Sequence, residues 1–182
     1  MRYESPFVGL FIVPRDYVRL LRTLRASIEG KIEFRERSHD EPINAWRAQI
    51  SRCYPIGVLA DDVEIHFLHY PSRAQAEAKW RRRSERIHWD KLRVKISWHD
   101  HPGIEEDLRE FDQMPFGAKL MLVPRAIPGT RHGVTLNDFS TDGTQQYWRA
   151  HKAFDVAAFL NSGDIRSLSW GRLLGWLFYW HY

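Results

Sequence analysis

The first part of the chain alternates apolar runs with segments of helical periodicity. Residues 7–13 form a continuous apolar run, which predicts a strand buried on both faces. Pro14 begins a predicted helix with apolar residues at every third or fourth position, and Gly30 ends it. The alternating segment 31–36 predicts another strand. The polar stretch 37–44 contains a proline and is expected to form a loop.

The middle of the chain predicts a hairpin followed by a helix. Tyr54–Leu59 and Val63–His69 are apolar enough for two strands, and the short polar segment 60–62 suits a tight turn between them. Ser72, with a glutamine three residues later, is a capping-box pattern for a helix that runs to about His88.

The remainder continues the alternation of strands and helices. It predicts, in order, a strand at 92–98, an acidic helix at 103–114, a strand at 120–123, a loop at 125–143 and helices near 153–160 and 164–180. This alternation favours a single α/β domain over residues 1–182. We expect a layered sandwich with a mostly parallel, mixed sheet that includes the hairpin, and with helices on both faces.

Composition narrows the class of protein. The 182 residues are 43% hydrophobic, as in globular proteins, and the single cysteine excludes an intramolecular disulfide. No run of about 18 apolar residues occurs, so we expect no membrane span and a cytoplasmic location. Because the chain has no glycine-rich phosphate loop, nucleophile elbow or nucleic-acid motif, we expect no cofactor and no nucleic-acid partner.

Positive charge is concentrated in one segment. Residues 72–95 carry nine basic and three acidic side chains, a net charge of +6, whereas the whole chain carries +4 and the rest therefore sums to −2. Such a local concentration differs from the spread charge of a general nucleic-acid binder.

Several motifs together resemble a known bacterial family. They are Ser5–Ile12 with Asp16-Tyr17, Tyr54-Pro55-Ile56-Gly57, Ile65–Tyr70, Lys79–Arg83 with Arg86-Ile87, and Glu110-Phe111-Asp112. This set is similar to the family catalogued as domain of unknown function 1919, whose members are often labelled exopolysaccharide biosynthesis proteins. The resemblance implies a role in a surface-sugar pathway and supplies no mechanism.

The chain departs from that family at two places. Members usually begin with a further strand and a polar turn, so this chain resembles a member that lacks the N-terminal strand. We then expect strand 7–13 to be an exposed edge, unless a later segment such as the aromatic C-terminal region covers it. Members also tend to carry an Asp-Arg-Asp-like turn where this chain has Trp98-His99-Asp100-His101.

Polar residues follow several predicted strands, where ligands bind in open α/β sheets. His69 follows one strand, and His99 and Asp100 follow another. A histidine beside a carboxylate suits general-base chemistry, which makes these three the candidate catalytic residues. The alternative is that Asp100 caps the next helix and the histidines lie at a hydrated edge.

Histidine spacing argues against a metal site. His66 and His69 are three residues apart on a strand and point to opposite faces, so one ion would not bind both. His66 shares a face with Glu64 and is equally well explained as a hydrogen-bonded core or rim residue.

The arginine-rich helix is the candidate substrate-binding element. Arg83 falls in an otherwise apolar helical stripe, and Arg82 and Arg86 are spaced to present a fork to one phosphate. Tyr54 and Tyr70 complete the candidate substrate-binding set. The ligand would be a phosphate-linked sugar or a lipid-carrier intermediate. The alternative is a solvated basic face in which Arg83 makes an internal salt bridge, for example to Asp62 or Glu64.

The aromatic C-terminal segment 168–182 is too short to span a bilayer. Docking onto the core or onto a second subunit explains it best, and peripheral membrane contact is the alternative. The favoured function is a transferase of exopolysaccharide or capsule biosynthesis that acts on a sugar or phosphate-linked sugar. The alternative is a non-catalytic accessory protein that binds a pathway partner or an anionic lipid surface.

Overall fold

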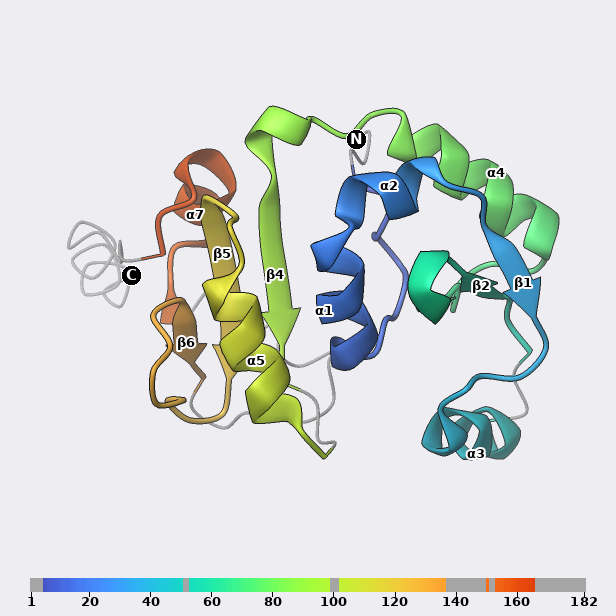
Figure 1. Ribbon diagram of the computed structural model, residues 1–182, viewed down its shortest axis with the longest axis horizontal. Helices are drawn as coiled ribbons and strands as arrows, with labels where there is room; N and C mark the ends of the chain where they lie inside the picture. The colour runs from blue at the N-terminus through green and yellow to red at the C-terminus, as the bar shows by residue number, and fades with distance from the viewer. Residues whose placement is uncertain (1–4, 51–52, 99–101, 137–149, 151–152, 166–182) are drawn as a thin grey trace, which may run out of the picture. The chain divides into compact units, whose positions relative to one another are not determined.

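The computed structural model describes residues 5–50, 53–98, 102–136, 150 and 153–165. It divides into two compact units, Met1–Lys91 and Leu92–Tyr182 (Figure 1). Each unit combines helices with a three-stranded sheet, which confirms the α/β class. The layered sandwich and the single domain stay predictions, and the aromatic helix expected at about 164–182 lies almost entirely outside the described residues.

Two short helices occupy the segment predicted as one helix. α1 (Pro14–Arg22) and α2 (Leu24–Glu29) are separated at Thr23, whose backbone leaves the helical region at φ −126° and ψ 29°. Gly30 follows α2 as its cap. Proline is well suited to the first turn of α1 because the N–H it lacks has no intrahelical partner there.

The first unit contains an antiparallel sheet in the order β1 (Glu33–Arg35), β2 (Ile56–Val58), β3 (Glu64–His66). β2 and β3 form the predicted hairpin, joined through the 3₁₀ turn η1 (Ala60–Asp62). The strands are shorter than expected. The hairpin also belongs to a sheet of its own and does not interrupt the parallel strands of the second unit.

The register gives this sheet two chemically different faces. Arg35, Ile56 and His66 pair across the three strands and therefore share a face, and Glu64 lies on it two residues before His66. We call this the polar face. Gly57 pairs with Ile65 on the opposite face.

Aromatic and aliphatic side chains cover that opposite face. A Cβ added at Gly57 would lie 2.5 Å from Ile32 Cδ1 and 2.8 Å from Phe67 Cε2, so only glycine fits beneath them. The ring of Phe67 lies 6.1 Å from Phe34 and 6.4 Å from Trp80, measured between centroids. We call this the aromatic face.

The predicted strand at residues 7–13 is wrong. Its first half is a turn closed by the Leu10 N–H and the Phe7 carbonyl at 3.2 Å, with Gly9 at φ +76° and Val8 37% exposed. Only Phe11 pairs with a strand, through two backbone hydrogen bonds to His66 at the edge of β3. The apolar composition suggested a strand, but the left-handed glycine interrupts its pleat.

The loop expected at residues 37–44 is also partly wrong, because α3 (Glu41–Gln49) begins within it. The Asp40 carboxylate accepts the Ile43 N–H at 3.0 Å as an N-cap, and Pro42 lies in the first turn. Proline is compatible with the first turn of a helix, so the presence of Pro42 did not justify the prediction of a loop.

α4 (Arg73–Ser84) confirms the predicted arginine-rich helix, although it ends four residues before His88. The Ser72 hydroxyl accepts the Gln75 N–H at 3.3 Å, as the capping pattern predicts. Trp80 is buried on its inner side, and the 3₁₀ turn η2 (Trp89–Lys91) follows.

The second unit contains a parallel sheet in the order β4 (Arg93–Ser97), β5 (Ala118–Val123), β6 (Gly133–Thr135). α5 (Ile104–Gln113) connects β4 and β5 and confirms the acidic helix. β6 lies inside the segment expected to be a loop, where three residues give too little periodicity to detect.

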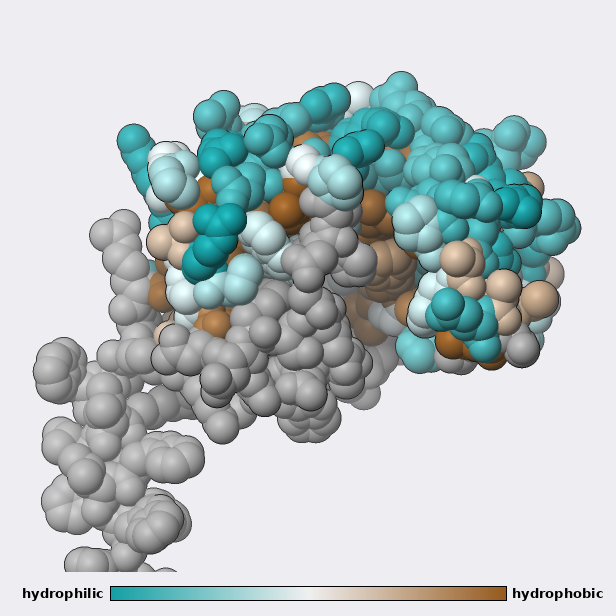
Figure 2. Space-filling model, turned by 90° about the horizontal axis from the view of Figure 1, so that it is seen from below, coloured by the Kyte–Doolittle hydropathy of each residue, from teal (hydrophilic) through white to brown (hydrophobic). Residues whose placement is uncertain are grey.

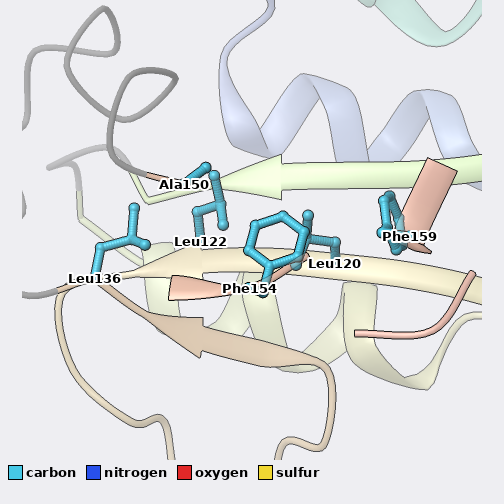
Figure 3. Packing of buried hydrophobic residues seen from close by; sticks show 6 residues of the cluster. All are labelled: Leu120, Leu122, Leu136, Ala150, Phe154 and Phe159. Atoms are coloured by element: carbon cyan, nitrogen blue, oxygen red, sulfur yellow. The ribbon is translucent and has the colours of Figure 1, made fainter. Parts of the chain in front are cut away.

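One hydrophobic cluster packs against this parallel sheet. Its buried side chains come from β5 and from later segments up to α7 (Val156–Ser162), which confirms the helix predicted near 153–160. Figure 3 shows the six residues: Leu120, Leu122, Leu136, Ala150, Phe154 and Phe159. No helix among the described residues has the length and apolar character to cross a membrane.

Candidate functional site

Glu64 lies at the centre of a polar cluster on the polar face of the antiparallel sheet. Its side chain is fully buried. The carboxylate accepts hydrogen bonds from the Arg35 guanidinium at 2.9 Å, from the His39 backbone N–H at 2.8 Å and from the Ser38 hydroxyl. A buried carboxylate is tolerated only when donors surround it in this way. We call the group formed by Asp16, Arg35, Ser38, His39, Asp62 and Glu64 the Glu64 cluster.

Asp16 joins the cluster from the first turn of α1 and is 2% exposed. Its Oδ2 accepts the Glu64 backbone N–H at 2.9 Å and lies 3.2 Å from His39 Nε2. Burial raises the pKa of Asp16 above its ordinary value, although the Glu64 N–H and the charges of His39 and Arg19 act in the opposite direction. Asp16 is thus placed to fix the orientation of the His39 ring.

Asp62 occupies the other side of the same ring. Its Oδ2 lies 3.2 Å from His39 Nδ1, and its Oδ1 accepts a hydrogen bond from Arg35. Although burial would raise the pKa of Asp62, its hydrogen bonds with Arg35 and His39 lower it below the ordinary value. Asp62 is 56% exposed at its side chain, so solvent reaches the cluster from this side.

The turn that presents Asp62 adopts an unusual backbone conformation. Asp61 and Asp62 both have positive φ, 58° and 57°, and neither is glycine. Asp tolerates the left-handed region better than most residues, but two in succession are uncommon outside sites where the surroundings hold them. Here the contacts of Asp62 with Arg35 and His39 supply that restraint.

His66 lies beside the cluster and is completely buried. Its Nε2 is 3.6 Å from Glu64 Oε2, and neither ring nitrogen has a hydrogen-bond partner among the described residues. The ring packs against Phe11 and Tyr54 at 5.7 and 5.8 Å between centroids. Burial lowers the pKa of His66 to about 4, so the ring is neutral at pH 7. The register of β3 confirms that His66 shares a face with Glu64, whereas the interpretation of His66 as a residue with a hydrogen-bonded side chain is wrong for the contacts among the described residues.

The arrangement around His39 is suited to proton transfer. The ring is 31% exposed and lies between a buried carboxylate, Asp16, and an exposed one, Asp62. One carboxylate can hold the tautomer and stabilise the imidazolium while the other side meets a substrate. Within the residues that the structure describes, no group of three or more His, Cys, Asp or Glu side chains is arranged to hold a metal ion.

Only one of the three catalytic residues predicted from the sequence lies among the described residues. His69 lies exposed in the turn after β3. His99 and Asp100 fall outside the described residues, so their grouping with His69 stays a prediction.

The predicted substrate-binding residues have different environments. Tyr54 and Tyr70 are both buried, and Arg83 donates to the Tyr70 hydroxyl at 3.1 Å and to the Val8 carbonyl at 2.7 Å. The structure thus brings Arg83 and Tyr70 together. Asp62 and Glu64, suggested as partners of Arg83, are instead bound by Arg35.

The other two arginines lie on the outer side and at the end of α4. Arg82 is exposed and Arg86, just beyond the helix, is half-buried. Arg82 lines a shallow hollow with its neighbours Arg81 and Glu85. Their joint binding of a phosphate stays a prediction.

Sequence reasoning missed His39, Ser38 and Arg35 as site residues. His39 stands in a polar stretch with no periodicity or motif around it, and the sequence named its partner Asp16 only as part of a family motif. The alternation Glu64-x-His66 was the one available signal, because it placed two ionisable side chains on one strand face.

A second histidine–carboxylate pair lies in the second unit. Asp112, 8% exposed on α5, accepts the backbone N–H groups of Arg131 and His132 at 3.1 and 3.0 Å, and lies 2.7 Å from His132 Nδ1. Burial opposes its ionisation, but these hydrogen bonds lower the pKa of Asp112 below the ordinary value. Asp112 therefore anchors the loop before β6.

Comparison with known proteins identifies the family of this chain. Over 138 residues it is 31% identical to an uncharacterized protein of Haemophilus influenzae strain Rd, covering 75% of this chain and 59% of that relative. The chain thus spans about three-fifths of the length of this curated relative. Residues 1–167 match the family described as a domain of unknown function, DUF1919. The chain therefore belongs to the DUF1919 family.

Proposed function

We propose that this protein is a transferase of bacterial exopolysaccharide or capsule assembly, and that His39 is its general base. The observation that carries the proposal is the position of the His39 ring, with Nε2 at 3.2 Å from buried Asp16 and Nδ1 at 3.2 Å from exposed Asp62. Perturbed carboxyl groups beside a histidine are frequent in active sites. The sugar pathway is the expectation raised by the family resemblance.

The proposed step transfers a sugar from a phosphate carrier to a sugar hydroxyl. His39 Nδ1 takes the proton from the acceptor hydroxyl, and the freed electron pair of that oxygen bonds to the anomeric carbon of the donor. The bond from the anomeric carbon to the phosphate oxygen breaks, and its electron pair leaves with the phosphate. Asp16 stabilises the imidazolium through Nε2, in the manner of an orienting carboxylate.

Asp62 has a different role in this proposal. The Asp62 side chain is 56% exposed, so a substrate acceptor reaches His39 from the side where Asp62 lies. The acceptor hydroxyl then either displaces the Asp62 carboxylate from His39 Nδ1 or bridges the two groups. Arg35 contacts both Asp62 and Glu64 and keeps the exposed carboxylate close to the ring. Together these contacts hold the base in place before the substrate arrives, as general-base catalysis requires.

Deletion of the gene followed by complementation tests the proposal. The wild-type gene should restore the surface polysaccharide of the deletion strain, and His39→Ala should not, although its product accumulates as a folded protein. His88→Ala, at an exposed position outside the cluster, is the matched control and should restore the polymer. Unchanged surface polysaccharide in the deletion strain would exclude a role of the protein in this pathway. Full restoration by His39→Ala would exclude His39 as the general base, and the assignment to the pathway would stand.

A surface of α3 favours the second candidate, a non-catalytic accessory protein. α3 has no buried residue and exposes Trp46 at 43%, and Ile50 directly after the helix is 38% exposed. Figure 2 shows tan and brown side chains among the teal ones at the right-hand end, where α3 lies. Vesicle co-sedimentation tests the lipid version of this candidate. Equal binding to neutral and anionic vesicles would argue against an electrostatic membrane contact.

A further inference from the structure

A cleft lies along α4, with walls from three segments of the first unit. Its volume is about 650 Å³, within the range of about 300–1,000 Å³ that is usual for small-molecule sites. One wall is the end of α2 and the segment after it, another is α4, and the third is the segment that follows α4. Its lining includes Trp80, Arg81, Glu77, Glu85, Trp89 and Glu29.

The cleft combines aromatic surface with polar groups. Trp89 is half-buried, and the Arg25 guanidinium lies 5.3 Å from its ring centroid, which holds the indole in place. Isoleucine side chains from both sides contribute the rest of the apolar lining. A sugar ring has an apolar C–H face and a rim of hydroxyl groups, so it matches a lining of this kind.

A buried donor in the cleft wall points to a ligand acceptor. Trp80 is 3% exposed, and its Nε1 has no hydrogen-bond partner among the described residues. The neighbouring rings of Phe7 and Phe67 meet Trp80 edge to face, with centroid distances of 5.6 and 6.4 Å. A buried N–H without a partner is unfavourable, and a ligand hydroxyl that reaches Nε1 from the cleft would satisfy it.

The charged groups of the cleft nearly balance. Three glutamates face one lysine and one arginine, a net charge of −1. Two of the glutamates are already fixed: Glu29 by Arg25 at 2.9 Å and Glu77 by Arg81 at 3.1 Å. Paired carboxylates still offer lone pairs to hydroxyl donors, whereas a polyphosphate would find no excess of positive charge.

A second hollow extends the cleft along α4. It measures about 450 Å³ and shares Glu77, Arg81 and Glu85 with the cleft. Two adjoining spaces with common walls suit a chain of sugars better than a single ring.

We propose that the α4 cleft binds a neutral oligosaccharide chain at a site separate from the Glu64 cluster. Ile32 and Trp80 line the cleft, and both belong to the aromatic face of the antiparallel sheet, whereas Glu64 and His66 lie on the polar face. The cleft thus holds glycan without taking part in the proton transfer proposed for His39. Its occupant is a saccharide of the class that a polysaccharide-assembly protein meets as product or acceptor.

Titration of the purified chain with sugars tests this site. The probes are linear hexasaccharides of glucose, of galactose and of N-acetylglucosamine, and the readouts are tryptophan fluorescence and saturation-transfer NMR. At least one probe should bind. Trp89→Ala should weaken that binding about tenfold, as expected for loss of an aromatic anchor. Trp80→Phe, which replaces the indole by a smaller phenyl ring and deletes the N–H, should weaken it about threefold or more.

Two controls make the result decisive. Trp46→Ala removes an exposed tryptophan on α3, outside the cleft, and should bind as wild type does. Glu85→Ala changes an exposed cleft residue without a folding risk and should weaken binding even if Trp89→Ala fails to fold. Absence of binding to all three probes, or equal binding by wild type, Trp80→Phe and Glu85→Ala, would overturn the proposal. Unchanged sugar binding by His39→Ala would show that the cleft is independent of the proposed active site, and loss of binding there would contradict their separation.

Discussion

The Asp16 carboxylate accepts the backbone N–H of Glu64 at 2.9 Å, although the two residues are 48 positions apart in the chain. This contact ties the first turn of α1 to the first residue of β3. It also places a buried carboxyl group next to the His39 ring, which is the relationship on which the proposed chemistry depends.

Replacement of Asp16 by Asn tests the pH dependence of this contact. Asn keeps an oxygen for the Glu64 N–H but cannot ionise. The pKa of Asp16 is raised in the folded state, so wild type loses folding free energy as the pH rises from the ordinary aspartate value through the raised one. As the pH rises through that range, the free energy of unfolding of Asp16→Asn should therefore increase relative to that of wild type. Urea unfolding at several pH values from 4 to 7 measures this, and a constant difference between the two proteins would contradict it.

Arg35→Met should be strongly destabilising. The substitution keeps most of the apolar stem but leaves Glu64, which is fully buried, without its cation. Loss of one partner of a buried pair typically costs about 3–5 kcal/mol. Arg37→Met is the control, because the Arg37–Glu41 pair is exposed and should contribute little to the free energy of unfolding. Similar losses for both variants would contradict the central role of Arg35.

His66→Leu should protect the fold in mild acid. The folded pKa of His66 is about 4 and its ordinary value is 6.5, so the unfolded chain binds the proton first as the pH falls and wild type loses stability below about pH 6.5. Between pH 7 and pH 5 this loss amounts to about 2 kcal/mol, and the variant should escape it. The packing cost of the substitution is the same at both pH values. Parallel pH profiles of unfolding free energy would therefore refute the prediction.

Asp112→Asn should loosen the loop before β6. Its carboxylate accepts two backbone N–H groups and contacts His132, and hydrogen bonds to a charged acceptor contribute about 1.5–3 kcal/mol. Because the pKa of Asp112 is depressed in the folded state, this stabilisation is present above the ordinary aspartate pKa and is lost as the pH falls through the depressed one. His132→Phe, which leaves both backbone bonds in place, should cost less. Hydrogen exchange of the Arg131 and His132 amides would report the loosening directly.

The elements that could be predicted from sequence are those specified by nearby residues. The hairpin of β2 and β3 follows from two apolar runs around a short polar turn, and the start of α4 follows from Ser72 and Gln75. The failures have local causes as well. Gly9 interrupts an apolar run, and Pro42 belongs to the first turn of a helix and not to a loop.

The Glu64 cluster could not be predicted, because its contacts join residues far apart in sequence. Arg35 reaches Glu64 across 29 positions, and the His39 backbone reaches it across 25. No local pattern encodes these distances, which depend on the pairing register of β1, β2 and β3. Periodicity could indicate only that Glu64 and His66 share a face.

Asp61 and Asp62 have almost identical φ angles, yet their tolerance to mutation should be opposite. The Asp61 side chain is exposed, and its backbone carbonyl, which any residue would supply, accepts from Arg19 at 3.3 Å. Asp62 contacts Arg35 and His39 through its carboxylate. In a library of turn sequences selected for function, position 61 should accept glycine and asparagine freely, whereas position 62 should keep its acid although glycine would suit its backbone better.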